Sequence, residues 1–325
     1  MITRRVFISS VILCVALIPF TEAQPAKVYH VGVVSPGGPY NRAVEGLRDG
    51  LREQGLNEGK QYVLHVTDTK GNLKELAADA ASSLEREKVD VIFSVPTSIT
   101  LVVKQATTQV PIVFFVGSDP VQSDLVDSFA KPGGRLTGVY SLSQELTGKR
   151  LEMLKQISPR IQKVAFFFDP TRPVAEAGVK SARDAARRLG IVLVDREVRS
   201  GEELQGSLQA LKTTDADALF FAPDATIQSH ASLIVAAEKT RKLPAMFYDR
   251  SLVADGGLAS YGVSYYAVGQ LAAKYVHKIL LGAHPTDLPV ERSERIELVL
   301  NARTARELGI TIPQSILLRA DEVIQ

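Results

Sequence analysis

The sequence has little of the material that thiol, metal or tryptophan chemistry needs. Its 325 residues include one cysteine, Cys14, five scattered histidines and no tryptophan. Cys14 lies in an N-terminal segment that we expect to be removed, so disulfides, thiol nucleophiles and cysteine–metal sites are excluded from the mature chain. The histidines show no metal-ligand spacing, and no metal site is predicted.

The motifs of nucleotide and acyl-transfer chemistry are also missing. The chain has no Gly-x-Gly-x-x-Gly, no phosphate-loop Gly-Lys-Ser/Thr and no Gly-x-Ser-x-Gly elbow, so we predict no cofactor and no catalytic residue. The formal net charge is +2 and no dense Lys/Arg block occurs. Binding to nucleic acid or to a membrane surface is therefore not expected.

The first residues have the pattern of a cleavable export signal. Residues 1–5 are basic, residues 6–20 are apolar, and Thr21-Glu22-Ala23 offers a small-residue cleavage site. The alternative is a membrane anchor, but a span needs about 20 apolar residues, and this run is shorter. We expect residues 1–23 to be a signal peptide, used by the Sec route or, given Arg4-Arg5, by the twin-arginine route. The mature chain is then periplasmic, with no membrane insertion.

Apolar strands that end in short polar tips recur along the chain. In the clearest example, residues 112–116 are apolar and are followed by Gly117-Ser118-Asp119-Pro120. Helical patterns of about 10–15 residues lie between such strands, which indicates parallel sheets with right-handed crossovers. Two series of this kind predict an α/β fold with two doubly wound, Rossmann-like lobes.

A further helix and strand follow the second series, so we expect the chain to cross back to the first lobe and return. The predicted lobe 1 comprises residues 27–141 plus 263–287, and the predicted lobe 2 comprises residues 142–262 plus 288–325. Three strands would then form a hinge between them. Such multiple crossings permit bending while they suppress free tumbling of the lobes.

The polar tips predict two facing rims of one binding cleft, because ligands in open α/β sheets lie outside the carboxyl ends of the strands. Thr97 and Ser98 offer hydroxyls beside the free N–H groups of a helix start, which suits an anion; simple N-capping is the alternative. Asp119, Asp169 and Asp224 each end a strand and are candidates for binding an ammonium group or sugar hydroxyls. For any single one of them, capping of the following turn is the alternative. The predicted ligand-binding residues are Ser35, Pro36, Pro96, Thr97, Ser98, Ser118, Asp119, Pro120, Asp169, Arg172, Asp224, Tyr248 and Tyr261.

Short segments spread in order over nearly the whole mature chain match the pattern of a known family. They are Gly46-Leu47-Arg48-Asp49-Gly50-Leu51, Gly55-Leu56, Glu58-Gly59, Lys104-Gln105-Ala106-Thr107, Pro111-Ile112-Val113-Phe114, Ser118-Asp119-Pro120-Val121, Lys131-Pro132-Gly133-Gly134, Thr137-Gly138, Gly148-Lys149-Arg150-Leu151-Glu152, Gly256-Gly257-Leu258-Ala259-Ser260-Tyr261-Gly262 and Leu317-Leu318-Arg319-Ala320-Asp321-Glu322. In these segments the chain resembles the ABC-transporter substrate-binding proteins of the type that includes tryptophan- and other aromatic-amino-acid-binding members.

The resemblance implies a type I periplasmic-binding fold that closes on a small molecule and delivers it to a membrane ABC permease. Carried over by position, the cleft would include Ser35, Thr97, Ser98, Asp119, Asp169 and Asp224. One segment departs from the family, which often has Asn-Pro-x-Asn-Pro after the first strand of the second lobe. This chain has Asp169-Pro170-Thr171-Arg172-Pro173 there, and an added acid and base at the rim can alter the charge preference for the ligand.

Taken together, residues and resemblance predict an exported, monomeric solute-binding component of an ABC importer that is not an enzyme. Its expected ligand is a small polar metabolite, an amino acid or an amino-acid-like compound. The alternatives are a periplasmic ligand-sensing subunit and a cleft enzyme with paired carboxylates, for which nothing in the sequence fixes a pair. A repressor of this fold is disfavoured, because an export signal stands where a DNA-binding helix-turn-helix would be.

Overall fold

The structure is a computed structural model that describes residues 27–69, 75–141, 143, 145–171, 173–223, 227 and 230–325. The predicted signal peptide, residues 1–23, lies outside this part of the chain, as do Arg172 and Asp224 of the predicted site. None of the helices in the described ranges is long and apolar enough to cross a bilayer.

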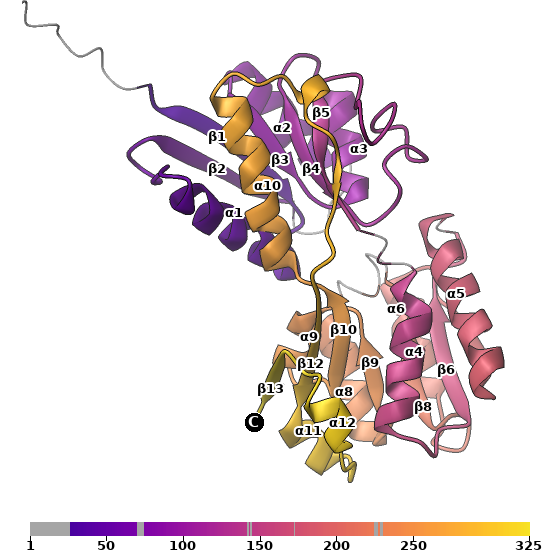
Figure 1. The fold of residues 1–325 in the computed structure, drawn as a ribbon. Coiled ribbons are helices and arrows are strands. Elements are labelled where there is room, and N and C mark those ends of the chain that lie inside the picture. The colour runs from indigo at the N-terminus through magenta and orange to yellow at the C-terminus, as the bar shows by residue number, and fades with distance from the viewer. Residues whose placement is uncertain are drawn as a thin grey trace, which may run out of the picture.

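Two sheets, each flanked by helices, form two lobes joined by a narrow junction (Figure 1). The first sheet has the strand order β11-β5-β4-β3-β1-β2, and the second has the order β13-β12-β10-β9-β8-β6-β7. The first lobe contains β1 (Tyr29–Ser35), η1 (Gly38–Tyr40), α1 (Asn41–Glu53), β2 (Tyr62–Asp68), α2 (Glu75–Arg86), β3 (Val91–Ser94), α3 (Thr97–Ala106), β4 (Ile112–Val116), β5 (Leu136–Tyr140), α10 (Tyr265–Leu280), η2 (Pro285–Asp287) and β11 (Glu291–Arg292). The second lobe contains α4 (Leu146–Ile157), β6 (Lys163–Phe168), α5 (Pro173–Leu189), β7 (Val192–Glu197), α6 (Gly201–Ala210), β8 (Ala218–Phe221), α8 (Ala231–Arg241), β9 (Ala245–Phe247), α9 (Arg250–Ala254), β10 (Ala259–Val263), β12 (Ile296–Asn301), α11 (Ala302–Glu307), α12 (Gln314–Leu317) and β13 (Glu322–Ile324).

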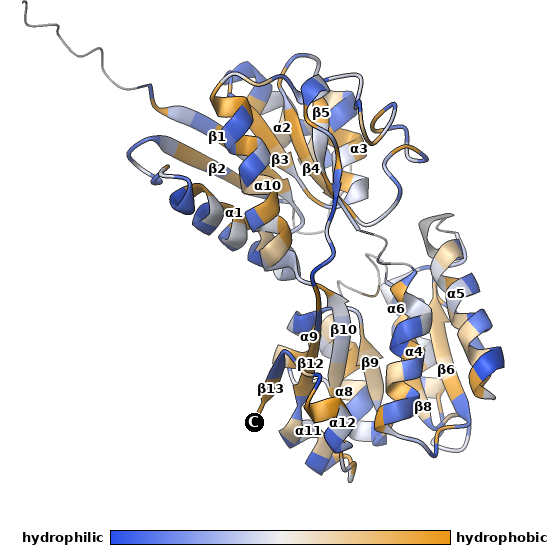
Figure 2. Cartoon of the chain, viewed as in Figure 1, coloured by the Kyte–Doolittle hydropathy of each residue, from blue (hydrophilic) through white to orange (hydrophobic). Residues whose placement is uncertain are grey.

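The chain passes between the two sheets three times. It leaves the first lobe after β5, returns between β10 and α10, and leaves again between β11 and β12. The last crossing is hydrophilic along its length (Figure 2). The predicted α/β fold with two lobes is thus confirmed, with one antiparallel pair, β10 with β12, among the parallel ladders of the described strands. The exact residue boundaries of the lobes stay a prediction; β11 pairs with β5 in the first sheet.

Helices cover both faces of each sheet, so every central strand is buried on both sides. In β4, Val113 and Phe115 face the core under α1 and α10. Ile112, Phe114 and Val116 face the core under α2 and α3. Burial of each large apolar side chain contributes about 1.5–3 kcal/mol, which fixes β4 in the middle of its sheet. The polar residues that follow β4 are therefore held at the carboxyl edge of that sheet.

Helices α1 and α10 pack so closely that side chains are excluded from their contact. A Cβ atom at Gly46 would lie 2.0 Å from the main-chain oxygen of Tyr266, and one at Gly269 would lie 2.0 Å from that of Ala43. At Gly50 it would lie 2.6 Å from the Cβ of Ala273. This packing anchors α10 on the first lobe, although the helix follows a strand of the second, and it explains why glycines recur in the segment 46–50.

A buried glutamate ties together three elements of the second lobe. Glu238 of α8 is fully buried, and its carboxyl group accepts hydrogen bonds from the main-chain N–H groups of Ala245 (2.8 Å) and Leu258 (3.1 Å). These donors lie at the start of β9 and just before β10. Burial raises the pKa of Glu238 to about 8, although the two N–H donors act in the opposite direction.

Gly46→Ala is expected to lower the free energy of unfolding by about 1–3 kcal/mol, because the added methyl group forces α1 away from α10. Gly206→Ala is the matched control, since Gly206 lies in α6 and an added Cβ meets nothing within 4 Å. This control is expected to stabilise the protein by about 0.5–1 kcal/mol. Urea denaturation measures both changes, and equal effects would contradict the account of the α1–α10 contact.

Glu238 is expected to make stability depend on pH. Because its pKa is higher in the folded than in the unfolded chain, its contribution is complete below the ordinary value of 4.5 and is lost as the pH rises to about 8. Glu238→Gln removes this titration, so the variant should gain stability relative to the unsubstituted protein over that range, by up to about 1.4 kcal/mol per pH unit. Urea denaturation at several pH values tests this; a stability difference that stays constant with pH would refute it.

Candidate functional site

The carboxyl ends of the two sheets face each other across the junction of the lobes. Helix η1, which follows β1 in the first lobe, contacts α9, which follows β9 in the second. Tyr40 ends η1, and Asp249 is the N-cap of α9, so both residues lie at this contact. Residues from the strand ends of both lobes are therefore brought together at one place, as expected for a binding site of an open α/β sheet.

Three aromatic rings of the first lobe form a wall beside this meeting point. The ring centroids of Tyr40 and Tyr265 are 4.9 Å apart, and those of Phe115 and Tyr265 are 5.7 Å apart. Burial raises the pKa of Tyr40 to about 12 and the pKa of Tyr265 well above its ordinary value. Both phenols are therefore neutral at physiological pH and keep a hydroxyl proton to donate. Neither tyrosine was in the predicted site; Tyr40 ends the helix η1 that follows β1, and Tyr265 begins the helix α10 that follows β10.

Two predicted hydroxyl residues meet between the tips of β3 and β4. The Oγ1 atom of Thr97 lies 3.1 Å from the Oγ of Ser118, which lies 3.1 Å from the Oγ of Ser123. Thr97 also accepts a hydrogen bond from the main-chain N–H of Gly117 (3.3 Å). The N-cap of α3 is Pro96, which makes no side-chain cap. Thr97 therefore bridges two strand tips and does not cap the helix, which was the alternative to an anion-binding role. Ser98 is half-buried in the first turn of α3.

The other predicted polar tips mainly hold turns. Asp119 Oδ1 accepts from the N–H groups of Val121 (2.8 Å) and Gln122 (3.2 Å). Asp169 is buried, and its Oδ1 accepts from both the N–H (2.9 Å) and the hydroxyl (2.6 Å) of Thr171. For these two aspartates the turn-capping alternative is confirmed.

The remaining predicted residues of the first lobe are small and offer little polar surface. Ser35 is fully buried, with its Oγ 3.3 Å from the main-chain nitrogen of Gly37, whose N–H donates to it. Pro36 and Pro96 are half-buried, and Pro120 is buried. These residues shape the strand tips.

A buried arginine lies beneath the two predicted tyrosines of the second lobe. Arg150 of α4 is fully buried, and its Nε donates to the main-chain oxygen of Tyr261 in β10 (2.7 Å). Its two terminal nitrogens donate to the hydroxyls of Thr147 and Ser143 (3.3 Å each). No carboxylate in the described part of the chain forms an ion pair with it. Burial lowers the pKa of Arg150 to about 10, so the guanidinium stays charged at neutral pH. Tyr248 and Tyr261 both lie within its electrostatic reach.

Charged side chains continue along the junction. Glu297 of β12 is hydrogen-bonded to the Ser264 hydroxyl, and burial raises its pKa. Arg250 of α9 binds Glu322 of β13 through two hydrogen bonds of 2.7 and 2.6 Å. Arg42 of α1 lies near Glu297, and its positive charge favours the ionised form of the Glu297 carboxyl group. Glu297, on the strand β12 that continues the last crossing, thus lies near cations of both lobes.

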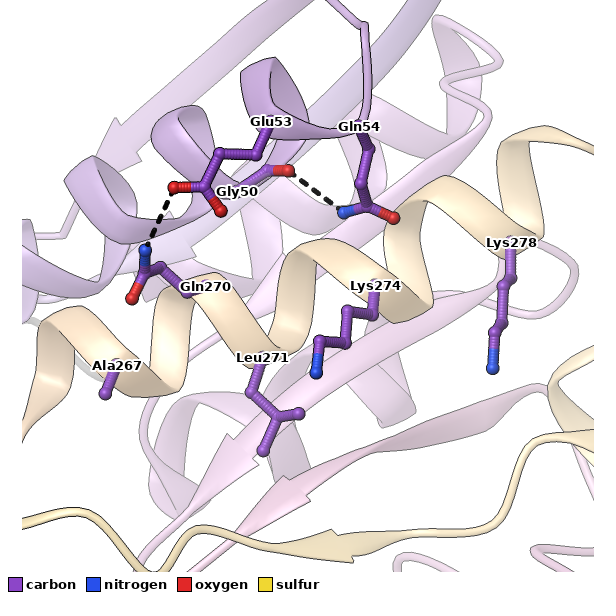
Figure 3. A pocket seen from close by; sticks show the side chains of 8 residues that line it. All are labelled: Gly50, Glu53, Gln54, Ala267, Gln270, Leu271, Lys274 and Lys278. Atoms are coloured by element: carbon purple, nitrogen blue, oxygen red, sulfur yellow. Dashed lines mark hydrogen bonds between the residues drawn. The ribbon is translucent and has the colours of Figure 1, made fainter.

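A separate groove of about 610 Å³ lies on the first lobe, between α1 and α10 (Figure 3). It is lined by Gly50, Glu53, Gln54, Ala267, Gln270, Leu271, Lys274 and Lys278. Every lining residue comes from the first lobe, so movement of the second lobe does not change the groove. Nowhere in the described ranges do three or more His, Cys, Asp or Glu side chains gather in a way that could hold a metal ion.

The chain is similar to known proteins over nearly its whole length. A family model described as ABC transporter substrate binding protein matches residues 31–324. A tyrosine-binding protein of Clostridioides difficile is 24% identical over 290 residues, which cover 89% of this chain and 83% of that protein. The crystal structure of a conserved domain protein from Vibrio cholerae matches with a TM-score of 0.80 and 30% identity, covering 92% of this chain and 100% of that one. The crystal structure of an ABC domain from Streptococcus pneumonia in complex with L-Trp matches with a TM-score of 0.79 and 26% identity, covering 93% of this chain and 100% of that one.

Arg150→Met is expected to lower the free energy of unfolding by about 1–3 kcal/mol, because it leaves the buried main-chain oxygen of Tyr261 without its donor. Lys149→Met is the matched control. It removes a neighbouring cation whose ion pair with Glu152 is partly exposed, so it should cost less than about 1 kcal/mol. Thermal and urea unfolding measure both. If Arg150→Met lowers the free energy of unfolding by no more than the control does, the guanidinium does not hold β10 in place.

Proposed function

The chain belongs to the ABC transporter substrate-binding protein family, and from this premise we propose that it is the solute-binding component of an ABC importer. It captures an amino acid or amino-acid-like metabolite between its two lobes and delivers it to a membrane permease. It acts after export, in the periplasm, as a monomer and without a cofactor or catalytic step. Nucleic acid is not among its partners.

The observation that carries this proposal is the contact between η1 of the first lobe, which ends at Tyr40, and α9 of the second lobe, whose N-cap is Asp249. A ligand held at that point is contacted by both lobes, so binding favours the closed arrangement over the open one. A ligand shifts such an equilibrium only by the difference between its affinities for the two states. Contacts from both lobes supply that difference, since they form together only in the closed state.

The aromatic wall supports an amino acid with an apolar or aromatic side chain as the ligand. Tyr40 and Tyr265 provide flat apolar surface, with Phe115 packed behind Tyr265 in the core, and the two phenols keep hydroxyls that can hydrogen-bond to a polar end. The C. difficile relative is named as a tyrosine-binding protein, and the S. pneumonia structure contains L-Trp. These relatives make L-tyrosine and L-tryptophan the first compounds to test.

We assign two of the predicted hydroxyl residues to the carboxylate end of the ligand. Thr97 and Ser118 lie at two neighbouring strand tips, beside main-chain N–H groups at the start of α3. Donors of this kind suit a carboxylate. Tyr248 and Tyr261 would complete the second-lobe side of the cleft. Arg172 and Asp224 remain proposed rim residues on the strength of their positions in the sequence.

Ligand binding is tested by thermal unfolding of the purified protein with L-amino acids, simple carboxylates and sugars. A compound present at 100 times its dissociation constant should stabilise the folded state by about 2.7 kcal/mol. We expect amino acids to stabilise the protein and sugars to have no effect. Absence of stabilisation by every compound near saturation, together with no co-purified small molecule in native mass spectrometry, would overturn the proposed function.

A further inference from the structure

Asp249 follows strand β9 at the junction of the lobes, where it is the N-cap of α9, and it is 4% exposed. Its Oδ1 accepts hydrogen bonds from the main-chain N–H (2.8 Å) and the hydroxyl of Ser251. Both of these donors belong to the turn that Asp249 itself begins, and both are electrically neutral.

No cation in the described part of the chain forms an ion pair with this carboxylate. The adjacent guanidinium of Arg250 is engaged in two hydrogen bonds to Glu322. The guanidinium of Arg150, also nearby, is engaged with three neutral oxygens. Asp249 is thus a buried carboxylate without a counter-ion in contact, an arrangement that is costly unless something else supplies the missing charge.

The groups around Asp249 suit a cation. Tyr40 and Tyr265 lie on the opposite lobe, and besides burial the nearby charge of Asp249 raises the pKa of both phenols. A cation attracted by a carboxylate gains further when it also lies over aromatic faces, by about 0.5–2 kcal/mol. Glu297, the other acid nearby, is only half-buried and lies near Arg42 of the opposite lobe, so its charge is better compensated by solvent and by the protein itself.

We propose that Asp249 binds the ammonium group of the ligand, with the Tyr40–Tyr265 pair forming the aromatic side of the same subsite. This inference rests on the proposed function and narrows it: the ligand must carry a primary ammonium group. Asp249 caps its turn through Oδ1, as Asp119 and Asp169 cap theirs, and at the junction of the lobes it adds a charge that the ligand neutralises.

The test compares amino acids with analogues that lack the ammonium group. The dissociation constants of L-tyrosine, L-tryptophan, 3-(4-hydroxyphenyl)propionate and 3-(indol-3-yl)propionate are measured by calorimetry for the unsubstituted protein and for Asp249→Asn. Asparagine keeps a side-chain oxygen for the turn, so the variant should fold, and circular dichroism and thermal unfolding check this. Asp217→Asn is the matched control, since Asp217 lies just before β8 and its carboxylate accepts from the main-chain N–H groups of Gln162 and Lys163 at the start of β6, at the opposite end of the same sheet.

Asp249→Asn should weaken binding of the amino acid by about 10- to 100-fold, the range for a charged hydrogen bond. It should leave the affinity for the matching propionate within about threefold, and Asp217→Asn should change neither. Equal losses for the amino acid and the propionate, or no loss for either, would overturn the proposal.

Two results with the unsubstituted protein complete the test. It should prefer the amino acid over the propionate by at least about tenfold, and equal affinities would overturn the role of Asp249 even if the variant failed to fold. If it bound none of the four compounds nor any other amino acid, the proposed function itself would fail, whatever the variant does.

Discussion

The chain passes three times between its two sheets, and this constraint decides how the lobes can move. One connection would let the lobes tumble freely, whereas three nearly parallel crossings restrict them to a hinge motion. Two of the crossings, at β10 and β12, are paired with each other as antiparallel strands of the second sheet. The hinge is therefore an extension of a sheet, and the strand tips on either side of it approach each other along a defined path.

Charge is concentrated where these crossings meet the strand tips. Arg150 is held by the main-chain oxygen of Tyr261 on one crossing and by Ser143 next to another. Glu297 on the third lies near Arg42 of the first lobe and Arg250 of the second. Burying such groups is costly by itself, so their position at the junction is better explained by ligand recognition and hinge geometry than by stability. The uncompensated carboxylate of Asp249 is the clearest case.

The sequence was sufficient for the fold, because strands that are apolar on both faces and end in polar tips leave few other arrangements. Residue types that favour helix starts also act as caps here: Ser200 caps α6 with its hydroxyl, and Asn301 caps α11 with its amide oxygen. The site was predicted only in part. Thr97 and Ser118 meet as neighbouring strand tips must, whereas Asp119 and Asp169 hold turns. Four residues of the site were not predicted: Tyr40, Tyr265, Arg150 and Asp249. Their roles come from contacts between segments up to about 225 residues apart, and neither hydrophobic periodicity nor motif spacing encodes such contacts.

The central claim is that a ligand closes the two lobes on each other, and the distance between the lobes tests it most directly. Gln105 in α3 and Lys180 in α5 are exposed and lie on different lobes. Spin labels on Gln105→Cys and Lys180→Cys, in a Cys14→Ser background, report that distance by pulsed electron paramagnetic resonance. The account predicts a shorter mean distance with saturating L-tyrosine or L-tryptophan than without ligand. An unchanged distance distribution while calorimetry shows the ligand bound would contradict it.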